Sequence, residues 1–280
     1  MATRKQIATG CRECSGRGYM ISSENGQYAR AEICGCISEC SDCGGSGTVF
    51  LENERGYRYL ERCGLCGITR LKVRRYNNAK IPSKYAGVLR SDDMDPCDLD
   101  PRSQQKSQYV AMDYVKSFVD KYPEKKGFLL MGGPGLGKTR LAIGAIAQLT
   151  LQKAVECVFT DFFFLLADLR KAYSEGIPEN EIIGPLINAE ILVIDEMGKG
   201  KSSEWEQNIL DQLISKRYNS SKKTLVTTNY VARESLPKKS RNKTEILEDR
   251  VGERIISRLY EMCTPLFIEG SDYRKSEISS

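Results

Sequence analysis

Short apolar runs and longer amphipathic segments alternate along the second half of the chain. Five runs have the length and composition of buried strands: residues 127–131, 156–160, 190–194, 224–228 and 265–268. Segments that space their apolar residues along one helix face lie mostly between them, at 109–122, 139–150, 161–173 and 206–218. This alternation predicts an α/β fold with a mainly parallel sheet that helices cover on both faces.

The first seventy residues follow a different pattern, which repeats at an offset of 29 residues. Two CxxCxGxG knuckles begin at Cys11 and Cys40. Each is followed by a strand-like segment, a polar turn, a second such segment and another cysteine pair, whose last member slips by one place between Cys36 and Cys66. The pattern predicts a duplicated small unit, a β-hairpin stapled by zinc.

Changes in composition divide the chain into three predicted parts. Residues 1–70 form a cysteine-rich zinc-binding domain, and residues 106–280 form a larger domain that carries the strand and helix alternation. Residues 71–105 combine prolines, an acidic stretch and weak periodicity, so we interpret them as a linker or docking segment.

Cysteine usage indicates metal binding in a reducing compartment. Eight of the 11 cysteines lie between Cys11 and Cys66, the N-terminus has no apolar leader, and no run approaches the ~18 apolar residues of a membrane span. We therefore expect a cytoplasmic protein without a membrane partner, in which clustered cysteines bind metal rather than form disulfides.

Eight thiolates are enough for two tetrahedral Cys₄ zinc sites. Either each unit closes its own site, which the duplication favours, or the outer pairs share one ion and the inner pairs the other. The slip at Cys36 leaves that ligand open, and an iron–sulfur cluster is an alternative that suits the knuckle glycines less well. The predicted ligands are Cys11, Cys14, Cys34, Cys36, Cys40, Cys43, Cys63 and Cys66.

Charge adds little evidence for a nucleic-acid partner. The formal net charge is +5, and each Cys₄ zinc site lowers it by two, which leaves +1. Two local clusters are either solvated or phosphate-facing: Arg70, Lys72, Arg74, Arg75, Lys80 and Lys84, and further on Lys238, Lys239, Arg241 and Lys243.

A glycine-rich loop joins the first predicted strand of residues 106–280 to the helix after it. GGPGLGKT fits GxxxxGK[ST], in the strand-to-helix context that this motif requires. Backbone N–H groups would wrap an anion, Lys138 would reach the β- and γ-phosphates, and Thr139 would complete Mg²⁺ coordination. The predicted nucleotide-binding residues are Gly132, Gly133, Pro134, Gly135, Leu136, Gly137, Lys138, Thr139 and Arg140.

Polar residues after later strands supply the rest of a hydrolytic site. Asp195 would hold Mg²⁺ at the carboxyl edge of the sheet, and Glu196 would activate the attacking water as general base. Asn229 would orient water against the γ-phosphate. Arg254 and Arg258 lie four apart and so share a helix face, as a salt-bridged surface or as an arginine finger.

Taken together, these strings resemble the bacterial helicase-loader family typified by DnaC and DnaI, in one clade with the insertion-sequence helper ATPase IstB. The likeness covers roughly residues 76–274 and rests on NNAKIPSKY, GGPGLGKTRLA, ILVIDEMG, TTNY, GERIISRL and the terminal DYR. The N-terminal knuckles are similar to the DnaJ zinc-binding region, but the chain has no histidine and therefore no HPD motif of a J-domain.

The resemblance implies an AAA+ fold with a five-stranded sheet of order 5-1-4-3-2, no large C-terminal lid, and ATP rather than GTP. It implies that a finger arginine acts on the nucleotide of a neighbouring subunit, so that the chain self-associates through the ATP site. The matching positions are Lys138 and Thr139 for Walker A, Asp195 and Glu196 for Walker B, Asn229 for sensor 1, Arg258 as the finger supported by Arg254, and Arg274 for sensor 2.

We therefore expect an ATPase, with Mg²⁺ and two zinc ions as cofactors, that loads a replicative helicase onto single-stranded DNA and is reset by hydrolysis. The alternatives are an IstB-like transposition helper that binds duplex DNA, and a nucleotide-gated zinc adaptor. The cysteine module is interpreted as a docking head. The alternative is that zinc only replaces the core that so small a domain lacks, and both roles can hold together. Direct DNA binding is a third alternative for the module.

Overall fold

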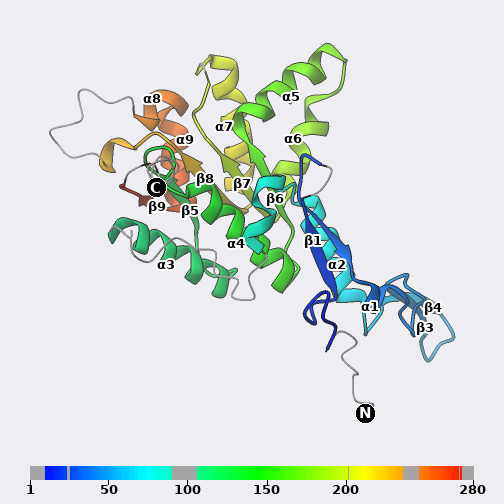
Figure 1. Cartoon of the computed structure of the whole chain (residues 1–280). Helices are drawn as coiled ribbons and strands as arrows, with labels where there is room; N and C mark the ends of the chain where they lie inside the picture. Colours follow the sequence, from blue (N-terminus) through cyan, green and yellow to red (C-terminus); the bar gives the residue numbers. More distant parts are fainter. Residues whose placement is uncertain are drawn as a thin grey trace.

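The computed structural model describes residues 10–23, 26–89, 106–200, 202–235, 246–270 and 272. Its central sheet is covered by helices on both sides, and a cysteine-rich part extends from one edge of this body (Figure 1). The second basic cluster and Arg274 lie outside the described residues, as do residues 90–105 of the predicted linker. No helix in these ranges is both long and apolar enough to cross a bilayer.

The sheet contains the five predicted strands, and every neighbouring pair is parallel. Its order is β6-β7-β8-β5-β9. When the strands are counted from β5, this is the order 5-1-4-3-2 read from the other edge, so the predicted topology is confirmed. The strands are β5 (Gly127–Met131), β6 (Cys157–Asp161), β7 (Ile191–Asp195), β8 (Lys223–Thr228) and β9 (Cys263–Phe267).

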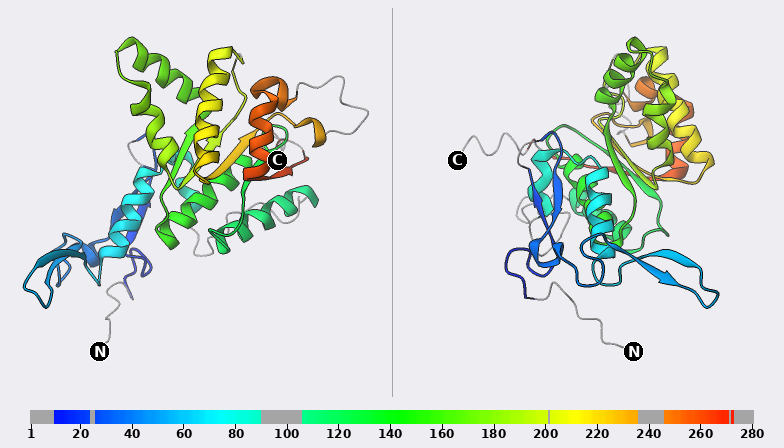
Figure 2. Two further views of the ribbon diagram at one scale, coloured as in Figure 1. Left: turned by 180° about the vertical axis from the view of Figure 1, so that it is seen from behind. Right: turned by 90° about the vertical axis from the view of Figure 1, so that its right-hand side faces the viewer.

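Both faces of the sheet are apolar, because successive side chains of each strand point to opposite sides. Phe128 and Leu130 of β5 face one core, and Leu129 and Met131 face the other. Figure 2 shows the two helical layers on either side of the sheet. The first layer is α2 (Gly67–Asn78), α3 (Lys106–Asp120) and α4 (Lys138–Lys153); the second is α5 (Phe162–Ser174), α6 (Glu179–Asn188), α7 (Glu204–Asn219), α8 (Leu247–Val251) and α9 (Glu253–Met262).

Helix α2 shows that the predicted linker is structured in its described part. Residues 71–78 continue this helix across the predicted boundary, and η1 (Ser83–Leu89) follows it. Val73 and Tyr76 are buried, in one hydrophobic cluster with residues of the first hairpin and of the ATPase half. The weak periodicity of residues 71–78 therefore did not reveal this helix. The reason is that α2 packs against two neighbours, the first hairpin and the ATPase half, so its apolar residues do not form one simple stripe. The domain limits themselves remain a prediction.

Two antiparallel hairpins form in the cysteine-rich part, as the repeat predicts. The first pairs β1 (Tyr19–Ser22) with β2 (Arg30–Ile33), and the short helix α1 (Gly35–Ser38) follows. The second pairs β3 (Thr48–Glu52) with β4 (Arg58–Arg62). The first hairpin lies along α2, whereas the second projects away from the body of the molecule (Figures 1 and 2).

A buried arginine joins α7 to the ends of α6 and β8. Arg217 is fully buried and donates to the main-chain carbonyls of Leu186, Ile187, Ala189 and Lys223. Burial lowers the pKa of its guanidinium to about 10, so it stays charged at neutral pH. The carbonyl dipoles of these four residues thus compensate the charge.

We expect Arg217→Met to lower the free energy of unfolding by about 3 kcal/mol, because it leaves several buried carbonyls without a donor. Lys216→Met, at the exposed neighbouring position, should change it by no more than about 0.5 kcal/mol. Urea unfolding measures both. Equal stability of the two variants would show that water satisfies these carbonyls instead.

Candidate functional site

The phosphate-binding loop between β5 and α4 has the backbone conformation that its glycines allow. Gly132 and Gly135 have φ angles of 140° and 74°, a region that favours glycine. A Cβ at Gly132 would lie 2.1 Å from the carbonyl oxygen of Ile268, and one at Gly135 would lie 1.7 Å from Oδ1 of Asp272. The loop therefore has no space for side chains at these positions.

The Lys138 ammonium lies inside this loop and is held by three oxygen atoms. Its Nζ donates to the carbonyls of Gly132 and Gly133, at 2.8 and 2.6 Å, and to Oδ1 of Asn229 at 2.9 Å. Asn229 comes directly after β8, so the structure brings the predicted sensor to the predicted phosphate-binding lysine. An incoming phosphate would replace these oxygen atoms as the partner of Lys138.

The carboxyl edge of the sheet presents oxygen ligands of the kind that Mg²⁺ prefers. Thr139 Oγ1 donates to Oδ1 of Asp195 at 2.8 Å, and Thr227 Oγ1 donates to the same oxygen. Burial raises the pKa of the Asp195 carboxyl, and the nearby charges of Asp161 and Glu196 raise it further. A site with this concentration of negative charge fits a divalent cation, which Thr139 and Asp195 would hold.

Asp161 belongs to the same edge and was not predicted as a site residue. It ends β6 and pairs in register with Asp195 on β7, and burial raises the pKa of its carboxyl. Its side chain also accepts hydrogen bonds from the N–H groups of Phe163 and Phe164 and so caps α5. The sequence contained one signal for this role, because Asp161 comes directly after the predicted strand at residues 156–160.

Glu196 follows Asp195 at this acidic edge of the sheet and has a constrained backbone conformation. Its φ angle of 53° is left-handed, and its N–H donates to Oγ1 of Thr227 at 3.2 Å. Its carboxylate forms an ion pair with Lys199, which sequence reasoning did not identify. Thr227 therefore contacts both acidic residues of the Walker B pair and fixes their relative position.

The two arginines of α9 share one face, as their spacing predicts, and both turn toward Asp211 of α7. Arg258 Nη1 lies 2.7 Å from Oδ1 of Asp211 and 2.7 Å from Oγ of Ser215. Arg254 Nε lies 3.6 Å from the same carboxylate oxygen, and its side chain is 72% exposed against 20% for Arg258. The single chain thus shows the salt-bridged arrangement, and a finger role requires Arg258 to leave Asp211.

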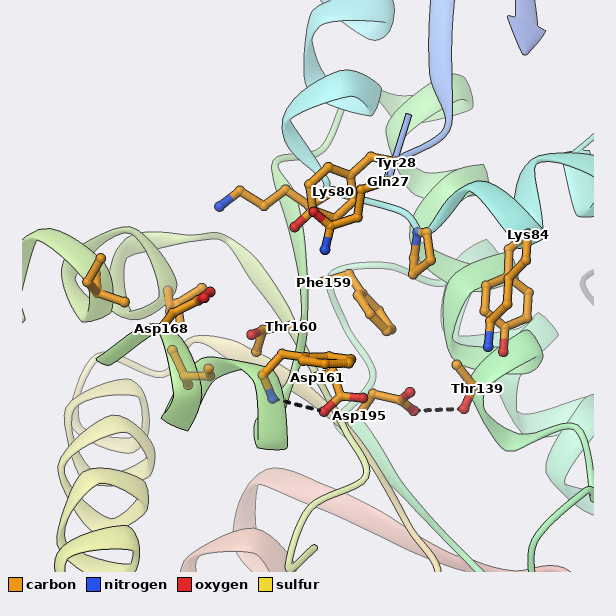
Figure 3. Close-up of a pocket in the computed structure, with 16 residues that line it drawn as sticks. Gln27, Tyr28, Lys80, Lys84, Thr139, Phe159, Thr160, Asp161, Asp168 and Asp195 are labelled. Atoms are coloured by element: carbon orange, nitrogen blue, oxygen red, sulfur yellow. Dashed lines mark hydrogen bonds between the residues drawn. The ribbon is translucent and has the colours of Figure 1, made fainter. Parts of the chain in front are cut away.

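A cavity of about 380 Å³ adjoins Thr139 and Asp195 and is lined from both halves of the chain. Figure 3 shows Thr139 and Asp195 at one end, and Gln27, Tyr28 and Lys80 at the other. The tip of the first hairpin is fastened there, because the Ala29 N–H donates to the carbonyl of Ile81 at 2.8 Å.

Four residues of the first basic cluster lie in three different environments. Lys80 and Lys84 line this cavity, Arg75 forms an ion pair with Glu156, and Arg70 turns back to the cysteines.

The eight cysteines converge in two groups of four, one in each repeat. Their sulfur atoms lie within 4.8 Å of one another in each group. Contacts of 3.8, 3.7, 3.6 and 3.4 Å join Cys11 to Cys34, Cys14 to Cys36, Cys40 to Cys63 and Cys43 to Cys66. A tetrahedron with Zn–S bonds of about 2.3 Å has S···S edges of about 3.8 Å, so both groups fit zinc. Cys36 takes part despite its slipped position, and the geometry follows the self-contained pairing.

Donors around the sulfur atoms support the same conclusion. The knuckle glycines Gly18 and Gly47 each donate an N–H to the sulfur of Cys14 or Cys43, at 3.2 Å in both cases. Arg70 Nε donates to Cys66 at 3.3 Å, and its Nη2 binds the carbonyl of Ser38 at 3.1 Å. Arg70 therefore connects the second group to the segment that joins the two repeats.

Metal content tests the pairing directly. Cys14→Ser/Cys34→Ser should lower zinc from two ions per chain to one, because both residues belong to one group. Cys14→Ser/Cys63→Ser should remove both ions, because it damages both groups. Elemental analysis of the purified proteins measures this, and the reverse pattern would indicate the nested pairing.

The P-loop, the acidic edge, Asn229 and the strand order define an AAA+ P-loop ATPase fold with a cysteine-rich N-terminal part. The chain belongs to the family of IstB-like ATP binding proteins, whose sequence profile matches residues 69–280.

Comparison with known proteins finds helicase loaders among the similar proteins. A crystal structure of the DnaC helicase loader aligns with a TM-score of 0.51 at 31% identity, over 60% of this chain and 93% of that one. The replicative helicase loader DnaC of Escherichia coli (strain K12) is 26% identical over 164 residues, which are 56% of this chain and 60% of DnaC. The crystal structure of DnaI, with a TM-score of 0.50 at 21% identity over 65% of this chain and 93% of that one, shows the same fold.

A relative of another kind comes from a mobile element. An ATP-binding protein of an insertion sequence from Geobacillus stearothermophilus is 34% identical over 102 residues, which are 36% of this chain and 39% of that protein. The expected DnaC- and IstB-type ATPase is thus confirmed at the level of the family.

Proposed function

We propose that this protein is an ATP-dependent loader that places a ring-shaped replicative helicase on single-stranded DNA in the cytoplasm. The observation that carries the proposal is the 31% identity to the DnaC helicase loader over 93% of the chain in that crystal structure. The cysteine-rich part, which precedes the matched region, would hold the helicase.

The arrangement of the site supports ATP hydrolysis to ADP and phosphate. The P-loop N–H groups and Lys138 would bind the phosphates, and Mg²⁺ held by Thr139 and Asp195 would offset their charge. Glu196 would accept the proton of the attacking water, which Asn229 helps to position. ATP would join subunits through Arg258, and hydrolysis would release the loader.

A pull-down with the zinc-loaded protein tests the loading role. In the presence of ATP it should retain a hexameric replicative helicase, and it should bind single-stranded DNA at least about tenfold more tightly than duplex. Retention of a transposase with duplex preference would overturn the proposal in favour of a transposition helper, which the insertion-sequence relative supports. Partner binding in ATP without any turnover would instead indicate a nucleotide-gated adaptor.

A further inference from the structure

The second hairpin exposes large apolar side chains at positions where a solvent-facing strand pair normally carries polar ones. Phe50 and Leu60 lie directly opposite each other on β3 and β4 and are 76% and 59% exposed. Tyr57, at the turn, is 69% exposed. Two-stranded hairpins are marginally stable alone, and an apolar pair of this size in water needs an explanation.

The internal repeat provides it, because the equivalent pair in the first hairpin is covered. The 29-residue offset aligns Ile21 with Phe50 and Ala31 with Leu60. Ile21 and Ala31 also lie directly opposite each other, in the same register. Ala31 is only 1% exposed, and Ile21 packs against the main hydrophobic cluster. The same face therefore points inward in one repeat and outward in the other.

Helix α2 shows what kind of element covers this face. Val73 and Tyr76 lie three apart on α2 and belong to the cluster that contains Ala31. Asn77, one residue further, holds the edge of β2, because its Oδ1 accepts from the Ala31 N–H at 2.8 Å and its Nδ2 donates to the Ala31 carbonyl at 3.0 Å. The first hairpin is thus recognised by an apolar stripe and a side-chain amide on one helix.

We propose that the Phe50–Leu60 face binds an amphipathic helix of a partner protein in the way that the first hairpin binds α2. The partner helix would place two apolar side chains three residues apart against Phe50 and Leu60. An Asn or Gln at the next position would bind the main chain of Leu60 at the edge of β4. This inference deepens the proposed function, because it assigns the surface that holds the partner.

Two other occupants fit the described residues less well. Nucleic acid is not favoured, because β3, β4 and their turn carry three arginines and three glutamates and so have no net charge. A second copy of the chain is not favoured, because its α2 is already covered by its own first hairpin. The occupant is therefore a helix of a different protein.

Crosslinking from the face itself tests this inference. The zinc-loaded full chain would carry a benzophenone amino acid at Leu60, and a second version would carry it at Met20, which is exposed on the outer face of the first hairpin. Each would be irradiated with the purified replicative helicase of the same organism, and separately with its cell extract. We expect a crosslink from Leu60, and not from Met20, that maps to a helix of the helicase.

Affinity measurements then separate this face from the rest of the hairpin. Phe50→Ser/Leu60→Ser should weaken partner binding at least about tenfold. Leu51→Ser/Tyr59→Ser, the opposite pair on the other face, should change it less than about twofold. Both variants should retain two zinc ions, which shows that the unit still folds.

The outcomes separate this inference from the loading role. A crosslink to a helix of another identified protein, reproduced with that protein purified, would keep the docking face and remove the helicase assignment. A crosslink to DNA or to a second copy, or none, would overturn the docking face, even if the wild-type chain still retains the helicase.

Discussion

Glu196→Gln should lower the rate of ATP hydrolysis about 10³-fold and leave ATP affinity within about threefold. Glutamine keeps the shape of the side chain but cannot accept a proton from water, and general-base catalysis contributes about 10²–10⁴-fold. Binding should persist, because the P-loop and Lys138 contacts do not involve this carboxylate. A steady-state phosphate-release assay and nucleotide binding by fluorescence measure the two quantities.

Glu204→Gln, at an exposed position at the start of α7, provides the matched control and should leave both quantities unchanged. The trapped ATP complex of Glu196→Gln should also retain the partner longer than the wild-type protein does. Unchanged turnover in Glu196→Gln would remove this residue as the general base and make Asp161, a further carboxylate on the same sheet edge, the next candidate.

Arg258→Ala should lower hydrolysis about 10³-fold although the variant's own nucleotide site is intact, because arginine fingers contribute about 10³–10⁵-fold. The loss should be partly restored on mixing with Lys138→Ala, which lacks a working P-loop but keeps the arginine. At some interfaces of the mixture, the intact P-loop of an Arg258→Ala subunit then faces the intact Arg258 of a Lys138→Ala subunit. Phosphate release at varied mixing ratios measures this recovery.

Arg258→Ala mixed with the double variant Lys138→Ala/Arg258→Ala is the control and should show no recovery. If both mixtures behave alike, Arg258 acts only within its own chain, through Asp211 and Ser215. The ion pair with Asp211 also means that assembly must offer Arg258 a better partner than this carboxylate, and a γ-phosphate supplies the charge to do so.

Local signals were sufficient for the strands and the phosphate loop. Five apolar runs flanked by polar turns identified the strands, and the glycines of 132–137 identified the loop, because such patterns have few physical interpretations. The strand order came from the family resemblance rather than from periodicity. The duplication favoured the observed grouping of the cysteines, since a unit that is duplicated whole carries a complete set of four ligands.

The missed features depend on contacts between distant segments. Asp161 lies beside Asp195 at the acidic edge of the sheet only because β6 pairs with β7, and this register is not encoded in the local sequence. Arg70 looked like one member of a basic run, and its role depends on α2 turning it toward Cys66. Helix α6 was not predicted, because Pro185 and a short apolar stripe weaken its pattern.

The residue that ends α2 also covers part of one edge of the sheet. β6 is an edge strand, and its Phe159 N–H donates at 2.8 Å to the carbonyl of Ala79, at the end of the helix that begins beside Cys66. Exposed strand edges recruit other chains, so a fragment that begins after this helix would leave that amide free to pair with another molecule. Helix α2 and Ala79, which ends it, therefore cover part of this sheet edge, and a fragment used to study the ATPase part should retain them.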